Sequence, residues 1–166
     1  MRATHDSAGF TLLELMVVVT IITVFAAGVL PVYQGSLSRI RGARATHELV
    51  ATVKHCQERA ITEGVEYRLY LDDEENSYWV KRLAKRDAGD KVFASPPGLT
   101  GQKRRLPEKT DMSRPSARRD RDEDAYYVAF YPNGACDYAT IKLRRADRKR
   151  VTISTKGRLG QLEVDE

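Results

Sequence analysis

A long apolar run near the N-terminus constrains this chain more than any other feature. The run extends from Phe10 to Val32 and contains a single ionisable side chain, that of Glu14. About 23 residues at about 1.5 Å each reach about 35 Å, which is enough to cross the hydrocarbon core of a bilayer. We therefore expect residues 10–32 to form a membrane-spanning helix. Because an ionised carboxylate costs about 3 kcal/mol in hydrocarbon, Glu14 needs a compensating partner there.

Two ordinary targeting signals are alternatives for this segment. Residues 1–8 are short and polar, so they could begin a secretory signal that is cut near Ala26-Ala27-Gly28. However, the apolar run is longer than the roughly 7 to 15 residues that are usual in such a signal. A plain signal anchor would explain the length of the run, but it would leave Glu14 without a function.

The start of the run carries a family resemblance. Gly9-Phe10-Thr11-Leu12-Leu13-Glu14 resembles the cleavage and methylation motif of type IV prepilins and of the pseudopilins of type II secretion. The resemblance implies that residues 1–9 are a leader, that a prepilin peptidase cuts after Gly9, and that Phe10 becomes a methylated N-terminus. It also implies that Glu14 faces the N-terminal amine of a neighbouring subunit, which would compensate the buried charge.

The same resemblance implies an orientation in the inner membrane. The N-terminus is expected in the cytoplasm and the C-terminal domain in the periplasm, with residues 10–32 acting first as an anchor and later as filament core. Two features of charge depart from the usual pattern. Arg2 is the only fixed positive charge of the leader, and the span is followed by Arg39, Arg41 and Arg44. Positive charge after a span normally favours the cytoplasm.

Residues 33–64 continue the helical pattern as an amphipathic helix. Apolar side chains recur at steps of four and three and form one stripe that should pack on a sheet, at Ala45, Leu49, Val53, Cys56 and Ala60. Pro31 lies inside the pattern and should kink the helix, unless one helix ends there and another begins. Gly64 is the expected C-terminal stop.

Residues 65–166 should form a β-sheet domain, because their apolar and polar side chains alternate as in half-buried strands. We expect strands over 65–71, 78–83, 126–131, 139–144, 151–154 and 159–164. The acidic stretch at residues 72–77 is interpreted as a solvated hairpin turn rather than a calcium loop. Residues 95–124 have several prolines and few large apolar side chains, so we expect a long exposed basic loop. The predicted fold class is α+β, with a long N-terminal helix packed on a C-terminal antiparallel β-sheet domain.

The C-terminal part carries a second, looser resemblance. The segments at residues 130–134, 151–154 and 157–159 are similar to the tail of H-type pseudopilins and FimT-like minor pilins. This resemblance implies a pilin-like fold and a minor subunit that initiates or caps a pseudopilus or a type IV pilus. The implied partners are other pilins or pseudopilins through the N-terminal helix, the prepilin peptidase and the inner membrane.

The residues show no pattern that is typical of catalysis or metal binding. The three histidines lie on the leader or on the helix, and no nucleophile or phosphate-loop spacing occurs, so we expect a structural protein rather than an enzyme. We expect no cofactor, no metal and no small-molecule substrate. Cys56 and Cys136 could form a disulfide in an oxidising compartment, and buried free thiols are the alternative.

DNA binding is the alternative function. The chain has 28 Lys and Arg against 23 Asp and Glu, and this net charge of +5 permits contact with nucleic acid without requiring it. Basic residues gather at one predicted turn between strands, at Arg144, Arg145, Arg148, Lys149 and Arg150. They could contact DNA phosphates without reading sequence, as in a minor pilin that acts as a receptor in DNA uptake. A solvated surface is the competing interpretation.

Overall fold

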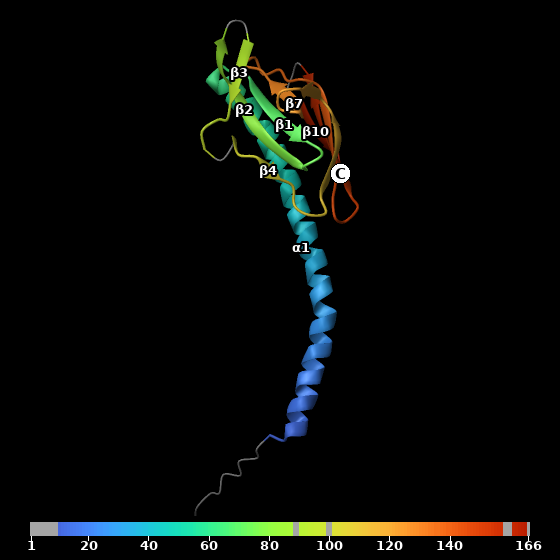
Figure 1. Ribbon diagram of the computed structural model, residues 1–166. Coiled ribbons are helices and arrows are strands. Elements are labelled where there is room, and N and C mark those ends of the chain that lie inside the picture. The colour runs from blue at the N-terminus through green and yellow to red at the C-terminus, as the bar shows by residue number, and fades with distance from the viewer. Residues whose placement is uncertain (1–9, 88–89, 99–100, 158–160, 166) are drawn as a thin grey trace, which may run out of the picture. The chain divides into compact units, whose positions relative to one another are not determined.

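The computed structural model describes residues 10–87, 90–98, 101–157 and 161–165, and the side chains at 28–36, 86–87 and 90 lie outside the description. The chain forms one long helix, α1 (Leu12–Glu63), followed by strands (Figure 1). The strands among these residues are β1 (Tyr67–Asp72), β2 (Ser77–Asp87), β3 (Asp90–Ala94), β4 (Arg104–Arg105), β5 (Asp111–Ser116), β6 (Arg118–Asp120), β7 (Ala125–Phe130), β8 (Ala139–Arg144), β9 (Arg150–Lys156) and β10 (Gln161–Asp165).

The chain divides into two compact units, Met1–Leu37 and Ser38–Glu166. The backbone of α1 is helical on both sides of Pro31 and through it, so one continuous helix replaces the alternative of two helices that meet at this proline. The kink expected at Pro31 stays a prediction, and the proline side chain lies outside the described residues. Leader residues 1–9, including Gly9, also lie outside them.

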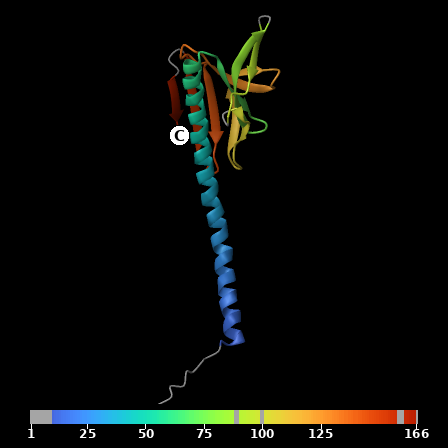
Figure 2. The ribbon, with the colours of Figure 1, turned by 90° about the vertical axis from the view of Figure 1, so that its left-hand side faces the viewer.

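The second unit contains two antiparallel sheets. One sheet has the strand order β3-β2-β1-β7-β6, with β4 paired to β2, and the other has the order β10-β9-β8-β5. The second half of α1 lies along the four-stranded sheet, and the six-stranded sheet lies beside the four-stranded sheet (Figure 2). The predicted α+β fold with a long helix packed on antiparallel strands is confirmed, and the strands form two sheets rather than one.

The predicted apolar stripe of α1 is the helix's contribution to the core. All five stripe residues are buried, with exposed fractions from 0% at Leu49 to 8% at Ala45. They pack in one cluster with inward-facing residues of both sheets, such as Leu69 and Val128 of the six-stranded sheet and Ile141 of the four-stranded sheet. Alternation along each strand therefore places one face against the helix, as the sequence pattern indicates.

Turn residues end the helix and connect the two strands of the first hairpin, as their chemistry predicts. α1 ends at Glu63, and Gly64 follows with φ +66°, a conformation that glycine adopts without a steric penalty. In the turn between β1 and β2, the carboxylate of Asp72 accepts hydrogen bonds from the backbone N–H groups of Glu74 at 3.1 Å and Glu75 at 3.0 Å. This acidic stretch is thus a hairpin turn.

The expected exposed loop at residues 95–124 is wrong in its central part. The segment contains β4, β5 and β6, and the side chains of Leu106 and Met112 are buried. β5 pairs with β8, and β6 pairs with β7, so hydrogen bonds from distant strands order a segment with little apolar content of its own. Many of its charged side chains are nevertheless exposed, as predicted.

Candidate functional site

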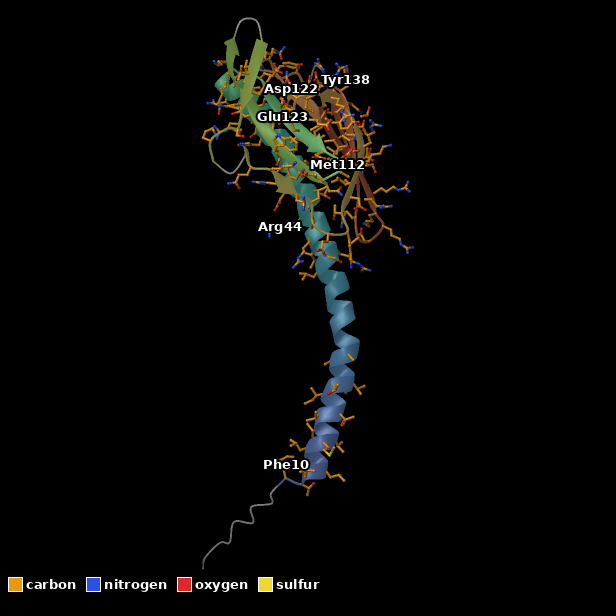
Figure 3. All side chains as sticks on the ribbon, in the orientation of Figure 1. Phe10, Arg44, Met112, Asp122, Glu123 and Tyr138 are labelled. Atoms are coloured by element: carbon orange, nitrogen blue, oxygen red, sulfur yellow. The ribbon has the colours of Figure 1, made fainter. Side chains whose placement is uncertain are left out.

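Phe10 and Glu14 lie at the start of the described chain, Phe10 just before the first turn of α1 and Glu14 within that turn. Phe10 is 78% exposed, and Figure 3 shows its side chain projecting from this end. The hydroxyl oxygen Oγ1 of Thr11 accepts a hydrogen bond from the backbone N–H of Glu14 at 3.2 Å. Because Glu14 is the third helical residue, Thr11 and Glu14 have the spacing of a capping box. Sequence reasoning missed the cap that Thr11 provides, although the Thr-x-x-Glu spacing was available.

The apolar side chains of the first four turns of α1 are exposed in the part of the chain that the structure describes. Twelve large apolar side chains between Phe10 and Phe25 are exposed, with exposed fractions of 41–78%. The hydroxyl groups of Thr20 and Thr23 donate to the carbonyl oxygens of Met16 at 2.8 Å and Val19 at 2.7 Å, so the helix itself satisfies them. An apolar surface of this extent normally marks contact with a membrane or with other protein chains.

No helix within the described part of the chain is long and apolar enough to cross a membrane. The side chains at 28–36 are outside that part, so the span expected over residues 10–32 stays a prediction.

The five basic residues singled out for nucleic-acid contact all lie at the end of the β8–β9 hairpin. Arg144 is paired with Asp111 at 2.8 Å, and the largely buried Arg145 is paired with Asp147 at 3.2 Å. Arg148, Lys149 and Arg150 are exposed and form no ion pair with any residue that the structure describes. The hairpin therefore brings the predicted residues together, but only three of the five are available for a partner.

Cys56 and Cys136 are both buried free thiols in the structure. Burial raises the pKa of each thiol, and the Sγ atom of Cys136 donates to the carbonyl oxygen of Gly157 at 3.6 Å. Both thiols are consequently poor nucleophiles at neutral pH, because the thiolate is the reactive form. The disulfide considered from the sequence is not formed here.

A second cluster, missed by sequence reasoning, covers the face of the six-stranded sheet that points away from α1. The rings of Tyr70 and Trp79 stack with centroids 5.5 Å apart, and the guanidinium of Arg68 lies 3.7 Å from the ring centroid of Phe93. The Tyr70 hydroxyl donates to Asp120 at 3.0 Å. The signal that could have indicated this cluster is the second set of alternating positions in these strands, which contains Tyr70, Trp79 and Tyr127. Because Arg68 also pairs with Glu66 at 3.0 Å, this cationic and aromatic face largely satisfies itself.

The architecture defines a class of protein. A long helix that is apolar and uncovered at its start, and that packs against an antiparallel β domain in its second half, is a pilin-type arrangement. Residues 4–30 match the family described as the prokaryotic N-terminal methylation motif. This match includes Gly9, Phe10 and Glu14, the residues on which the sequence resemblance rests.

Curated relatives and solved structures agree with this class. Two fimbrial proteins of Pseudomonas aeruginosa are each 48% identical over 58 residues, which is 35% of this chain and 37% of the relative's length. Two structures of the minor pseudopilin EpsH from the type II secretion system of Vibrio cholerae match the fold. The first has a TM-score of 0.58 and 12% identity over 75% of this chain and 95% of EpsH. The second has a TM-score of 0.59 and 12% identity over 76% of this chain and 94% of EpsH.

The chain therefore carries the N-terminal methylation motif and has a pilin-like fold similar to that of a minor pseudopilin. The identity to the fimbrial proteins spans little more than a third of their length, whereas the likeness to EpsH spans nearly all of that chain and concerns the fold.

Proposed function

We propose that this chain is a minor pseudopilin or minor pilin, a structural subunit of a pseudopilus or type IV pilus. The observation that carries the proposal is the division of one continuous helix. One face of its second half is buried in a folded domain, whereas the apolar side chains between Phe10 and Phe25 are exposed. In a subunit of this kind, the uncovered half lies in the inner membrane before assembly and among the helices of neighbouring subunits afterwards.

Processing by a prepilin peptidase is part of the proposal. Cleavage after Gly9 would make Phe10 the N-terminal residue, and methylation would follow on its amine. The exposure of Phe10, just before the first turn of α1, supports an accessible cleavage site. The mature chain would then begin one residue before Thr11, so that cleavage leaves the Thr11 cap intact.

Glu14 is proposed to pair with the N-terminal amine of a neighbouring subunit. Its side chain is exposed on an otherwise apolar helix surface, where an unpaired carboxylate is costly once water is removed. A positively charged amine from the next subunit would satisfy it. The C-terminal domain would lie in the periplasm, at the position from which a minor subunit initiates or caps the filament.

DNA binding is a second candidate function, and it is supported by the three exposed basic residues of the β8–β9 hairpin, Arg148, Lys149 and Arg150. A receptor that binds phosphates through these residues would show duplex binding that weakens steeply as salt rises. A gel-shift assay across salt concentrations tests this candidate, and no binding at low salt removes it.

The mature N-terminus tests the proposed function. The full chain is expressed together with a prepilin peptidase, and the N-terminal residue is determined by mass spectrometry. We expect a mature chain that begins at N-methylated Phe10, and we expect Gly9→Val to block this cleavage. A mature chain that begins after residue 27 would indicate a secretory signal, and a chain that keeps residues 1–9 would indicate a plain anchor.

A further inference from the structure

We propose that the end of the β domain at which α1 enters it, at Ser38, is a docking surface for the anionic phospholipid headgroups of the membrane that holds the helix. We call this surface the basic collar. Its members are Arg41 and Arg44 of α1, Arg104 and Arg105 of β4, and Arg148 and Lys149 of the β8–β9 turn. The inference rests on the proposed function, because it requires the apolar segment of α1 to enter a membrane.

Three separate parts of the chain meet at the collar. Arg41, Arg44, Arg104 and Arg105 line one open groove of about 220 Å³ between α1 and the edge of the six-stranded sheet. On another side of the helix, a Cβ atom placed on Gly42 would lie 3.0 Å from Oγ1 of Thr110 and 3.7 Å from the Cγ atom of Arg145. The start of the β8–β9 turn therefore packs directly on α1 at the level of Arg41.

Figures 1 and 2 both place β4 and the β8–β9 turn at the same end of the domain, and Figure 3 shows Arg44 at that end. The chain enters the domain here, because Ser38 is the first residue of the second unit. The basic side chains thus surround the part of α1 that directly follows the apolar segment.

Little of this positive charge is neutralised within the chain. Among the described residues, Arg44 pairs with Glu48 at 3.0 Å, whereas Arg41, Arg105, Arg148 and Lys149 form no ion pair. The carboxylate of Asp147 is already engaged by Arg145. Exposed cations that are left unpaired at one end of a domain favour an anionic surface as their partner.

The position of the collar in the chain favours a lipid surface over other anions as its binding partner. The ten residues from Val32 to Arg41 are helical, and the nine steps between the first and the last rise by about 14 Å at most. The headgroup layer beyond the hydrocarbon core is about 5–8 Å thick, and charge interactions reach about 8 Å further at physiological salt. Arginine side chains extend several ångströms toward such an interface. The collar is consequently within electrostatic reach of the headgroups.

The collar also gives a function to charges that the proposed topology does not explain. Arg39, Arg41 and Arg44 follow the apolar segment, where positive charge opposes export of the domain. If the collar holds the exported domain on the outer headgroups before assembly, these arginines serve the membrane-bound subunit. Release from the lipid surface would then accompany incorporation into a filament.

The test uses the full chain in vesicles of phosphatidylcholine alone and in vesicles that also contain phosphatidylglycerol. Amide hydrogen exchange is measured over residues 38–48, 102–107 and 144–150. We expect slower exchange in all three segments on the anionic vesicles, and we expect high salt to remove the difference. In the double variant Arg41→Gln with Arg105→Gln, the protection from exchange that the anionic vesicles add should fall by about fivefold for each charge removed.

A matched control removes two other exposed cations, with Lys54→Gln and Arg121→Gln. Neither forms an ion pair with a described residue, and Lys54 lies about 20 Å along α1 from Arg41. The control should keep the protection of the unmodified chain. Equal loss in both double variants would show that only net charge matters and would overturn the proposal.

The remaining outcomes separate this proposal from the proposed function. An inserted chain with the same exchange on both kinds of vesicle contradicts the collar alone. Protection that appears only when duplex DNA is added would assign these cations to nucleic acid and would also overturn the collar. A chain that stays in the aqueous fraction with both vesicles contradicts membrane insertion, and therefore both proposals.

Discussion

The backbone N–H of Glu14 donates a hydrogen bond to Oγ1 of Thr11 at 3.2 Å, so the residue proposed to pair with a neighbouring subunit also belongs to the cap of its own helix. A carboxylate in the first turn is favoured by the helix dipole as well. Substituting the Glu14 side chain leaves this backbone donor in place but removes both the dipole interaction and the proposed subunit contact, so the cap and the charge need separate variants.

Thr11→Val removes the hydroxyl acceptor and leaves the charge of Glu14 in place. We expect this variant to destabilise the first turn of α1 by about 1 kcal/mol, because a capping side chain is lost. Hydrogen exchange of the amides at residues 12–15, with the full chain in vesicles, measures the effect. Thr23→Val is the control, since the hydroxyl of Thr23 bonds only to the carbonyl oxygen of Val19 in mid-helix. Equal fraying in both variants would contradict the cap.

Leu49 anchors the second half of α1 in the domain core, with 0% of its surface exposed. Leu49→Ala should lower the free energy of unfolding of the β domain by about 2–5 kcal/mol, through lost burial and the cavity left behind. Ile40→Ala, on the same helix but at a residue that is 64% exposed, should change it by about 0.5 kcal/mol or less. Denaturant unfolding followed by the fluorescence of Trp79 compares the two. Similar losses would mean that the helix does not pack through this stripe.

Gly157 is held beneath the ring of Tyr138. Its φ is +40°, and a Cβ atom placed on it would lie 2.4 Å from Cζ of Tyr138. We expect Gly157→Ala to destabilise the domain by about 1–3 kcal/mol, from backbone strain and the steric clash together. Adding Tyr138→Ala should recover the part that is due to the clash. Thermal unfolding of both single variants and the double variant measures this coupling, and purely additive effects would contradict the contact.

The buried hydroxyl of Tyr67 predicts a loss of stability at alkaline pH. Burial, with a hydrogen bond to Glu63 at 2.8 Å, raises the pKa of Tyr67 to about 12. An unfolded tyrosine has a pKa of about 10, so between about pH 10 and pH 12 the unfolded chain has lost a proton that the folded chain keeps. The stability contribution is complete below pH 10 and is lost as the pH rises toward 12.

Tyr67→Phe should flatten that part of the stability profile, and Tyr138→Phe, at an exposed tyrosine, should leave it unchanged. Denaturant unfolding at a series of alkaline pH values measures both profiles. A Tyr67→Phe profile as steep as that of the unmodified chain would assign the alkaline loss to other groups.

The parts of the fold that follow from local patterns were predictable. The stripe from Ala45 to Ala60, the stop at Gly64 and six of the strands each have a periodicity or turn residue that is visible in a short window. The second resemblance, near Phe130, also lies in strands that the alternation indicates. These elements needed no knowledge of distant partners.

The parts that depend on distant pairing were not predictable in the same way. β5 contains charged residues and a proline, and it becomes a strand because β8 supplies its hydrogen bonds. The division into two sheets, and the aromatic cluster around Tyr70 and Trp79, likewise depend on which strands become neighbours. The basic collar combines α1, β4 and the β8–β9 turn. Any short stretch of the sequence contains only some of its charges, so the sequence does not indicate that they lie together.

Glu14→Gln in the full chain tests the central claim most directly. Glutamine suits the third helical position of a capping box, so this substitution removes the charge while leaving the cap geometry available. The measurement is the amount of partner pilin or pseudopilin that co-purifies with the membrane-bound chain. We predict unchanged recovery in the membrane fraction and a loss of at least about tenfold in co-purified partner, because the charge pair between subunits is gone. Unchanged co-purification would contradict the role of Glu14 in assembly.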